Sequence, residues 1–409
     1  MKKIILLLSL VVGNFTFAQT NGQEIQEQEF KLSALPYYNY GKGLGMTSAD
    51  SLFQLNIRFR MQNRVTYYDY EDEASNYEAQ IRRLRLRLDG YVGNPKFQYV
   101  LQLSFAPGDV GGALVEGENL NIIRDAAVSY VANENWNFLF GQTKLPGNRQ
   151  RVNSSGSLQL TDRSINNAQF NIDRDFGFQA NHLREFKEKF SYRVKTAVSS
   201  GNGRNWSGKD ENVALTGKLE VLPFGTFKKG GEYFEGDIQF EEKPKVLFSG
   251  SWHKNYNASL TRGQQGDELF ESRDLQSVFI DALAKYRGWA GMFSYMNRTT
   301  DDPLTSMIDQ EGVTQTRYVF AGEGMDYQLS YTFPVSHYEI IGRFSTQNVD
   351  DKIYQLNVPN QKQYSLGITK YIWEHAFKIQ TEFTYDQMQF HTGEQKGNWY
   401  VRFQIEIGI

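Results

Sequence analysis

Arginine and leucine alternate strictly in one short segment, QIRRLRLRLDGYVG, which begins at residue 80 and contains Arg83, Arg85 and Arg87. Because successive side chains of a β-strand point to opposite faces, this pattern predicts a strand with one aliphatic face and one column of guanidinium groups. Guanidinium groups match the oxygens of phosphate in paired hydrogen bonds. The chemistry open to this face is therefore anion recognition, although on a soluble sheet the arginines would simply face water.

The preceding segment, LFQLNIRFRMQNR from residue 52, repeats the arrangement with Arg58, Arg60 and Arg64 on one face and apolar residues on the other. Consecutive strands are usually neighbours in a sheet, so the two sets of arginines are expected to form one basic patch. On the inner wall of a pore such a patch selects anions. Alternatively, these arginines pair with carboxylates of an inward-folded loop and brace the wall, and the two roles are compatible.

A long polar stretch, Pro146–Arg174, is expected to be a constriction loop that faces the basic patch. Its basic side chains outnumber its acidic ones, which predicts an electropositive eyelet. The alternative is a plain surface loop outside the pore. The basic residues are Lys144 just before the stretch and Arg149, Arg151, Arg163 and Arg174 within it, against Asp162 and Asp173.

Composition and the N-terminal residues indicate an exported protein that does not form disulfides. Residues 1–18 have a basic start, an apolar run and a small-residue cleavage site, as in a secretory signal peptide. The chain contains no cysteine, so no disulfide is available. Its formal net charge of −3 argues against a nucleic-acid partner. After the signal, no apolar run approaches the roughly 18 residues of a spanning helix.

Segments of alternating apolar and polar residues recur about sixteen times, from a strand starting near residue 52 to one starting near residue 398, with one near residue 317. Brief connections alternate with long polar loops, as in transmembrane β-barrels. We therefore predict an all-β fold, a transmembrane antiparallel barrel of about sixteen strands over residues 51–409. Residues 19–50 are expected to be an N-terminal periplasmic segment, with GKGLG at Gly41 as flexible chain entering the barrel.

One connection, Pro223–Lys243, is long where the pattern expects a short periplasmic turn. It is either a periplasmic insertion or a hairpin missed in the count. A soluble propeller or sandwich would also alternate, but it should show a repeating blade motif, and none is visible.

The chain resembles the phosphate-selective porin O and P family, in particular its Bacteroidetes-type branch. That resemblance implies a homotrimeric sixteen-stranded outer-membrane porin in which phosphate or pyrophosphate passes an arginine ladder and a lysine-rich loop. Arg58, Arg60, Arg83, Arg85 and Arg87 stand where the ladder would be, and Lys144 and Arg149 open the matching loop. The loop departs from the family in having no lysine after Lys144, and the chain ends in Ile409 rather than an aromatic residue. The matching segments are GKGLGMTSADSLFQLNIRFRMQNR at Gly41, RRLRLRLDGYVG at Arg82, RDAAVSY at Arg124, FGQTKLPGNRQ at Phe140, LTDRS at Leu160 and DRDFGFQ at Asp173.

The sequence thus predicts an outer-membrane porin for passive diffusion of small hydrophilic solutes that favours anions such as phosphate. Its other partners would be outer-membrane lipid and lipopolysaccharide, and no cofactor, metal or catalysis is expected. The alternatives are a general porin without selectivity and a receptor or scaffold barrel with a plugged lumen. An outer-membrane enzyme is disfavoured because the histidines are scattered and no nucleophile motif such as G-x-S-x-G is present. Those histidines are His182, His253, His337, His375 and His391.

Overall fold

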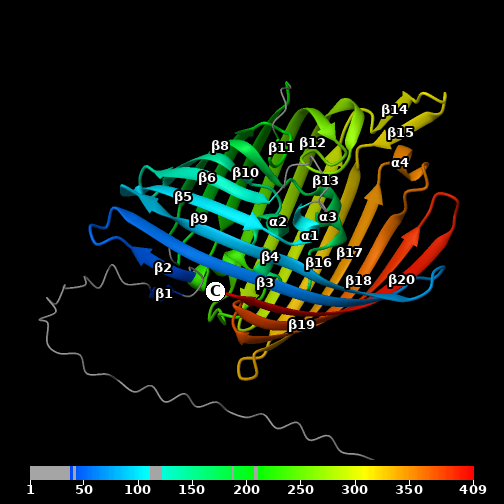
Figure 1. The fold of residues 1–409 in the computed structure, drawn as a ribbon. Helices are drawn as coiled ribbons and strands as arrows, with labels where there is room; N and C mark the ends of the chain where they lie inside the picture. Colours follow the sequence, from blue (N-terminus) through cyan, green and yellow to red (C-terminus); the bar gives the residue numbers. More distant parts are fainter. Residues whose placement is uncertain (1–36, 40–42, 111–121, 187, 207–210) are drawn as a thin grey trace, which may run out of the picture.

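Sixteen antiparallel strands close into a barrel in the computed structural model (Figure 1). This count agrees with the prediction from the alternating segments. The structure describes residues 37–39, 43–110, 122–186, 188–206 and 211–409. The predicted signal peptide, residues 1–18, lies outside the described residues.

The barrel strands follow one another around the wall in chain order. Their bounds are β3 (Phe53–Asp69), β4 (Asn76–Val92), β5 (Asn94–Ser104), β6 (Ile123–Val131), β7 (Trp136–Lys144), β8 (Arg174–Arg184), β9 (Ser191–Ser199), β10 (Val213–Leu222), β11 (Lys245–Leu260), β12 (Glu268–Tyr286), β13 (Trp289–Thr299), β16 (Gly322–Thr332), β17 (Tyr338–Val349), β18 (Asn360–Trp373), β19 (Phe377–Gln389) and β20 (Gln395–Gly408).

The last strand closes the barrel by pairing with the first, from Trp399 opposite Asp69 to Gly408 opposite Arg60. Below Arg60, β3 continues past the end of β20, and the short strand β2 (Gly43–Thr47) takes the place beside it. A further strand, β1 (Tyr37–Asn39), pairs with β2. The expectation that the chain around GKGLG is flexible is therefore wrong for residues 43–47, which cover an edge of β3 that β20 leaves unpaired.

The barrel is apolar outside and polar inside. Phe178 and Leu366 are 64% and 57% exposed, whereas Lys378 and Glu406, on neighbouring strands, are fully buried. Water would penalise so many exposed apolar side chains, but lipid does not. The burial pattern therefore assigns the outer face to a bilayer. No helix of the described residues is long and apolar enough to cross a membrane.

Two connections differ from the expected pattern. Residues 223–243 are described throughout and none is in a strand, so they are an insertion at the short-turn end and the hairpin alternative is wrong. They contain the 3₁₀ segment η3 (Lys228–Tyr233). The strand expected near residue 317 is also corrected. Residues there belong to β15 (Thr314–Tyr318), which forms a separate hairpin with β14 (Leu304–Ile308), and the barrel strand begins at Gly322.

Replacing Leu366 with arginine tests the outward assignment. Leu366 lies midway along β18 and faces out, so Leu366→Arg should lower the free energy of unfolding by about 2–4 kcal/mol. Equilibrium unfolding by guanidinium in lipid vesicles measures the change. Val335, 92% exposed in a turn at the barrel end, provides the control Val335→Arg, which should leave stability nearly unchanged. Equal effects at the two positions would contradict the assignment.

Candidate functional site

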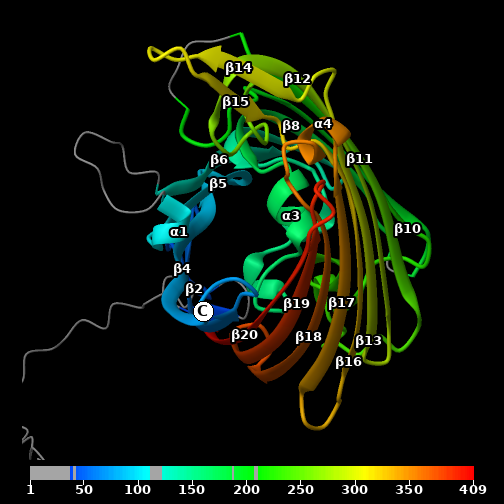
Figure 2. The same cartoon turned by 90° about the vertical axis from the view of Figure 1, so that its right-hand side faces the viewer.

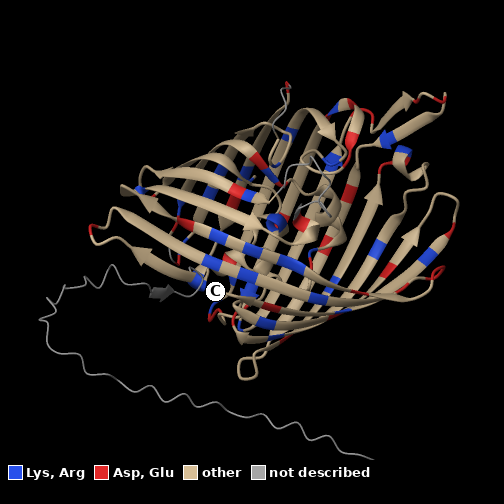
Figure 3. Cartoon of the chain, viewed as in Figure 1, with Lys and Arg blue, Asp and Glu red and all other residues tan. Residues whose placement is uncertain are grey.

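The arginines of β3 and β4 lie directly opposite one another. Arg58 pairs with Arg87 in the strand register and Arg60 pairs with Arg85. Figure 3 shows the basic positions recurring along these two neighbouring strands. Like charges placed opposite each other across a sheet repel. The wall therefore needs carboxylates close to it. Glu406 of β20 lies 3.9 Å from Arg60, and three aspartates are each shared by two or more arginines.

A β-bulge adds a further arginine that strict alternation misses. The register between β3 and β4 shifts after Gln62, so that Ile81 faces out, 47% exposed, and Arg82 joins the lumenal face. Without the shift, Arg82 would share the lipid face with the leucines, where a guanidinium costs about 2–4 kcal/mol. The doublet Arg82–Arg83 next to an alternating strand was the signal in the sequence that such a bulge was needed.

The carboxylate of Asp162 is shared by three arginines. Its oxygens lie 2.7 Å from Arg82, 2.9 Å from Arg83 and 3.2 Å from Arg64. Burial alone would raise the pKa of the Asp162 carboxyl, but the surrounding guanidinium groups outweigh burial and hold that pKa well below its usual range. Asp162 therefore stays ionised and ties the constriction loop to the basic wall.

Asp109 acts in the same way from the short helix α1 (Pro107–Val110). Its carboxylate lies 2.6 Å from Arg85 and 2.9 Å from Arg124, and it accepts a hydrogen bond from Ser104. Burial opposes ionisation, yet the two guanidinium groups lower the pKa of Asp109 below its usual range. Helix α1 is thus also held against the basic wall.

The third carboxylate, Asp89 of β4, pairs with Arg58 and lies 2.9 Å from Arg87. Each of these three aspartates meets two or three guanidinium groups. Ion pairing therefore braces the wall but neutralises at most half of its positive charge.

The segment Pro146–Arg174 crosses the lumen, as Figure 2 shows for its helix α3 (Ile165–Phe170) inside the ring of strands. On the basic wall, the hydroxyl of Ser155 accepts from Arg60 and Arg85 at 2.7 and 2.9 Å. On the opposite wall, the backbone N–H of Arg149 donates to the carboxylate of Asp281 of β12 at 2.9 Å. The alternative of a surface loop outside the barrel is therefore wrong.

Two of the loop arginines hold backbone carbonyls, one in the insertion and one in the loop itself. Arg149, in α2 (Arg149–Val152), donates to the backbone carbonyls of Glu232 and Phe234 of the insertion. Arg163 donates to the carbonyl of Asn153 at 3.0 Å. Arg163 also lines the second cavity, whereas Arg149 lines neither of the two cavities, so the expected eyelet does not use every basic residue of the loop.

The other basic residues predicted for this region each hold a loop or wall group and also line a cavity. Lys144 donates to the carbonyl of Val152 at 2.8 Å. Arg151 binds Asp173, and Arg174 binds Asp125 at 2.9 Å. Each of these three basic side chains lines one of the two cavities beside the loop.

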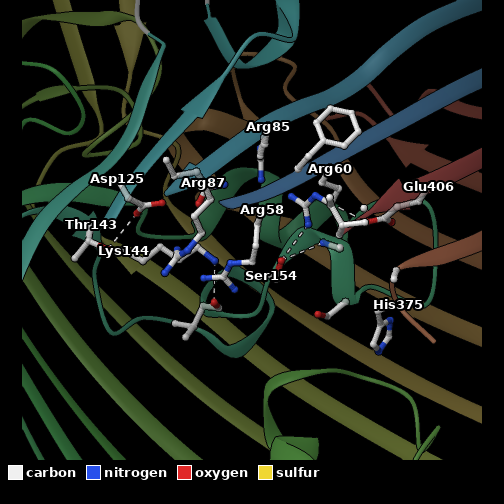
Figure 4. Close-up of a pocket in the computed structure, with 18 of the residues that line it drawn as sticks. Arg58, Arg60, Arg85, Arg87, Asp125, Thr143, Lys144, Ser154, His375 and Glu406 are labelled. Atoms are coloured by element: carbon white, nitrogen blue, oxygen red, sulfur yellow. Dashed lines mark hydrogen bonds and ion pairs between the residues drawn. The ribbon is translucent and has the colours of Figure 1, made fainter. Parts of the chain in front are cut away.

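The first cavity, of about 460 Å³, lies toward the short-turn end of β3 and β4 (Figure 4). The second, of about 330 Å³, lies toward the long-loop end of β4. Arg402 of β20, which was not among the predicted pathway residues, also lines the second cavity. The charged residues lining the first are Arg58, Arg60, Arg85, Arg87, Lys144, Arg174, Asp125 and Glu406, and those lining the second are Arg82, Arg83, Arg151, Arg163, Arg402 and Asp162.

Of the predicted pathway residues, Arg64 and Arg149 line neither of these two cavities within the described part of the chain. Arg64 binds Asp162 instead. Within the described residues, no group of three or more His, Asp or Glu side chains is placed to hold a metal ion.

Comparison with solved structures places the fold among outer-membrane porins. The outer membrane channel DcaP of Acinetobacter baumannii shares 14% identity with a TM-score of 0.54, covering 89% of this chain and 99% of that one. OprB of Pseudomonas putida shares 9% identity with a TM-score of 0.53, covering 87% and 94%. An anion-selective porin from Comamonas acidovorans shares 11% with a TM-score of 0.51, covering 87% and 99%. At these identities the likeness concerns the fold.

Residues 53–221 match the model of the family described as phosphate-selective porin O and P. This match confirms, over that part of the chain, the resemblance carried by the arginine strands and the loop. A search of curated protein sequences finds no match. The closed barrel and the family match together support a porin located in an outer membrane.

Removing the carboxylate of Asp162 tests its role as the anchor of the loop. Asp162→Asn should lower the free energy of unfolding by about 3 kcal/mol, because three guanidinium groups lose their counter-charge. Asp72→Asn is the control, since Asp72 pairs with Lys396 on the surface with its side chain 62% exposed, and its loss should cost below about 1 kcal/mol.

The comparison of the wild type with Asp162→Asn also predicts how the stability difference between them depends on pH. Because the pKa of Asp162 is depressed in the folded protein, its stabilisation is present above the unfolded value of about 4 and is lost as the pH falls through the folded value. The stability difference between the wild type and Asp162→Asn should stay constant from about pH 8 to pH 5 and shrink below about pH 4. Unfolding curves across this range measure it, and a difference that vanishes near pH 6 would contradict the anchor.

Proposed function

We propose that the protein is a passive outer-membrane channel for small hydrophilic solutes and that its lumen favours anions such as phosphate. The observation that carries this proposal is the excess of positive charge on both sides of the constriction loop. Six cationic and two anionic side chains line the first cavity, and five arginines and one aspartate line the second. An anion that enters either cavity meets a net attraction, which water screens only partly in a confined space.

The paired arginines support anion conduction as well as bracing. A guanidinium group has five N–H donors, so a carboxylate that takes one or two of them leaves others for a passing anion. Arg58 and Arg87 share Asp89 within the wall itself. Both line the first cavity, so substituting the pair removes two positive charges from the proposed anion path.

The assembly and surroundings of the barrel form part of the same proposal. The outer face of β5–β8 carries a row of exposed aromatic side chains, and the family resemblance implies a homotrimer. The rest of the outer wall would face outer-membrane lipid and lipopolysaccharide, reached after cleavage of the predicted signal peptide. The exposed aromatic residues are Phe97, Tyr130, Phe138, Phe140 and Phe178.

A plugged receptor or scaffold barrel is the second candidate. It is favoured by the fact that the loop touches opposite sides of the lumen, through Ser155 on the arginine wall and through the backbone N–H of Arg149 on Asp281 of β12. A barrel of this kind would give no steady single-channel currents in a planar bilayer. A general porin would conduct without anion preference and without block by phosphate.

Block of the chloride current by phosphate tests the proposal. In a planar bilayer, added phosphate should reduce the wild-type conductance, because it competes for the same guanidinium groups. The double variant Arg58→Gln/Arg87→Gln should need about tenfold more phosphate for the same block, since two charged donors are lost.

The matched control removes two positive charges from the barrel end, Lys229→Gln/Lys243→Gln, where both side chains are 73% exposed. It should leave the block unchanged. Wild-type conductance that is indifferent to phosphate, or equal effects of the two double variants, would contradict a phosphate-binding wall.

A further inference from the structure

The insertion Pro223–Lys243 folds into the lumen and is held there by contacts with several strands of the barrel. Lys285 of β12 donates to its backbone carbonyls at Gly231 and Gly236, at 2.7 and 2.6 Å. The carboxylate of Asp237 accepts from the backbone N–H of Gly288, in the turn between β12 and β13, at 2.7 Å. An apolar cluster of Phe227 with Leu222, Leu247, Leu283 and Met292 lies beneath it. The insertion is therefore a fixed body rather than a surface turn.

The insertion forms hydrogen bonds with the constriction loop at two points. The carboxylate of Glu235 accepts from the backbone N–H of Gln159 at 3.1 Å and from the amide of Gln328, on β16, at 3.2 Å. Arg149 of the loop donates to the carbonyl of Phe234 at 3.3 Å and to that of Glu232. Glu235 and Gln159 are both buried, so these bonds do not compete with bulk water.

Within the described chain, none of residues 223–243 lines either of the two cavities. Glu232 and Tyr233 border a third cavity of about 10 Å³ beside Arg149, which has room for about one water molecule. The ring of Phe234 meets that of His375, which lines the first cavity, edge to face at 5.1 Å between centroids. The insertion is therefore expected to act on permeation through the groups that it holds in place.

We propose that the insertion positions the constriction loop from the short-turn end, with Glu235 and Arg149 as the positioning residues. The width and the selectivity of the passage then depend on a segment that does not line it. The inference deepens the proposed function and rests on it, since it assigns what holds the constriction. Gln159 is also held by the barrel, since its carbonyl accepts from Thr369 at 2.6 Å and from Gln380 at 2.7 Å. Loss of Glu235 should therefore loosen the loop around the Gln159 N–H while the loop stays attached to the wall.

Hydrogen–deuterium exchange of the folded protein tests the contacts between the insertion and the loop independently of any channel recording. In Glu235→Ala the N–H of Gln159 loses its buried acceptor, and peptides covering Gln159 should exchange about tenfold faster than in the wild type. In planar bilayers the same variant should show a changed single-channel conductance and more current fluctuation. Arg149→Gln removes the guanidinium that binds the insertion at the second point, and it should change exchange and conductance in the same direction. If Glu235→Ala does not fold, Arg149→Gln takes its place in both measurements.

The control is Glu242→Ala on the same insertion, where Glu242 pairs with Lys228 at the surface with its side chain 84% exposed. It should match the wild type in exchange and in conductance. Unchanged exchange at Gln159 in folded variants would overturn the proposal, as would faster exchange with an unaltered current. A wild type that conducts but prefers cations would overturn the proposed anion preference and leave the exchange result, and thus the positioning role, intact.

Discussion

Charge cannot face lipid at low cost, and the arrangement of the whole barrel depends on that constraint. It directs the guanidinium groups of β3 and β4 inward, and at Arg82 it does so through a β-bulge. Once gathered, these groups repel one another and require carboxylates. Asp109 and Asp162, from two different loops, supply them and are thereby drawn into the lumen. The positive charge that would attract anions thus also holds these two aspartates, and the segments that carry them, inside the lumen.

The lumen is consequently asymmetric. Along β3–β8 the wall carries the arginines and borders the first cavity, whereas along β10–β19 the loop and the insertion pack against the wall. An apolar cluster around Phe170 of α3 seals part of this packed half. Solutes are left with the basic side, so the position of the loop and the charge of the wall act together on what passes.

The strand pattern could be predicted from sequence because it is local: side-chain alternation and loop length revealed the sixteen strands to within a few residues for most of them. The inward face of Arg58, Arg60, Arg83, Arg85 and Arg87 followed from the same alternation. The bulge at Arg82 could have been found from the cost of a charge in lipid. The lumenal position of the loop was predicted from its length and charge. The groups that hold it there, and the position of the insertion, could not be predicted, because they rest on contacts between residues far apart in the chain, such as Gln159 with Glu235.

The central claim is that shared carboxylates leave the open side of the lumen positively charged. The reversal potential of the wild-type channel under a KCl gradient tests this most directly. The reversal potential should be shifted toward the equilibrium potential of chloride. The shift should become smaller at high salt, because dissolved ions screen the arginine charges. A potential directed toward that of potassium, or one of zero, would show that the excess of arginines does not govern permeation and would contradict the account.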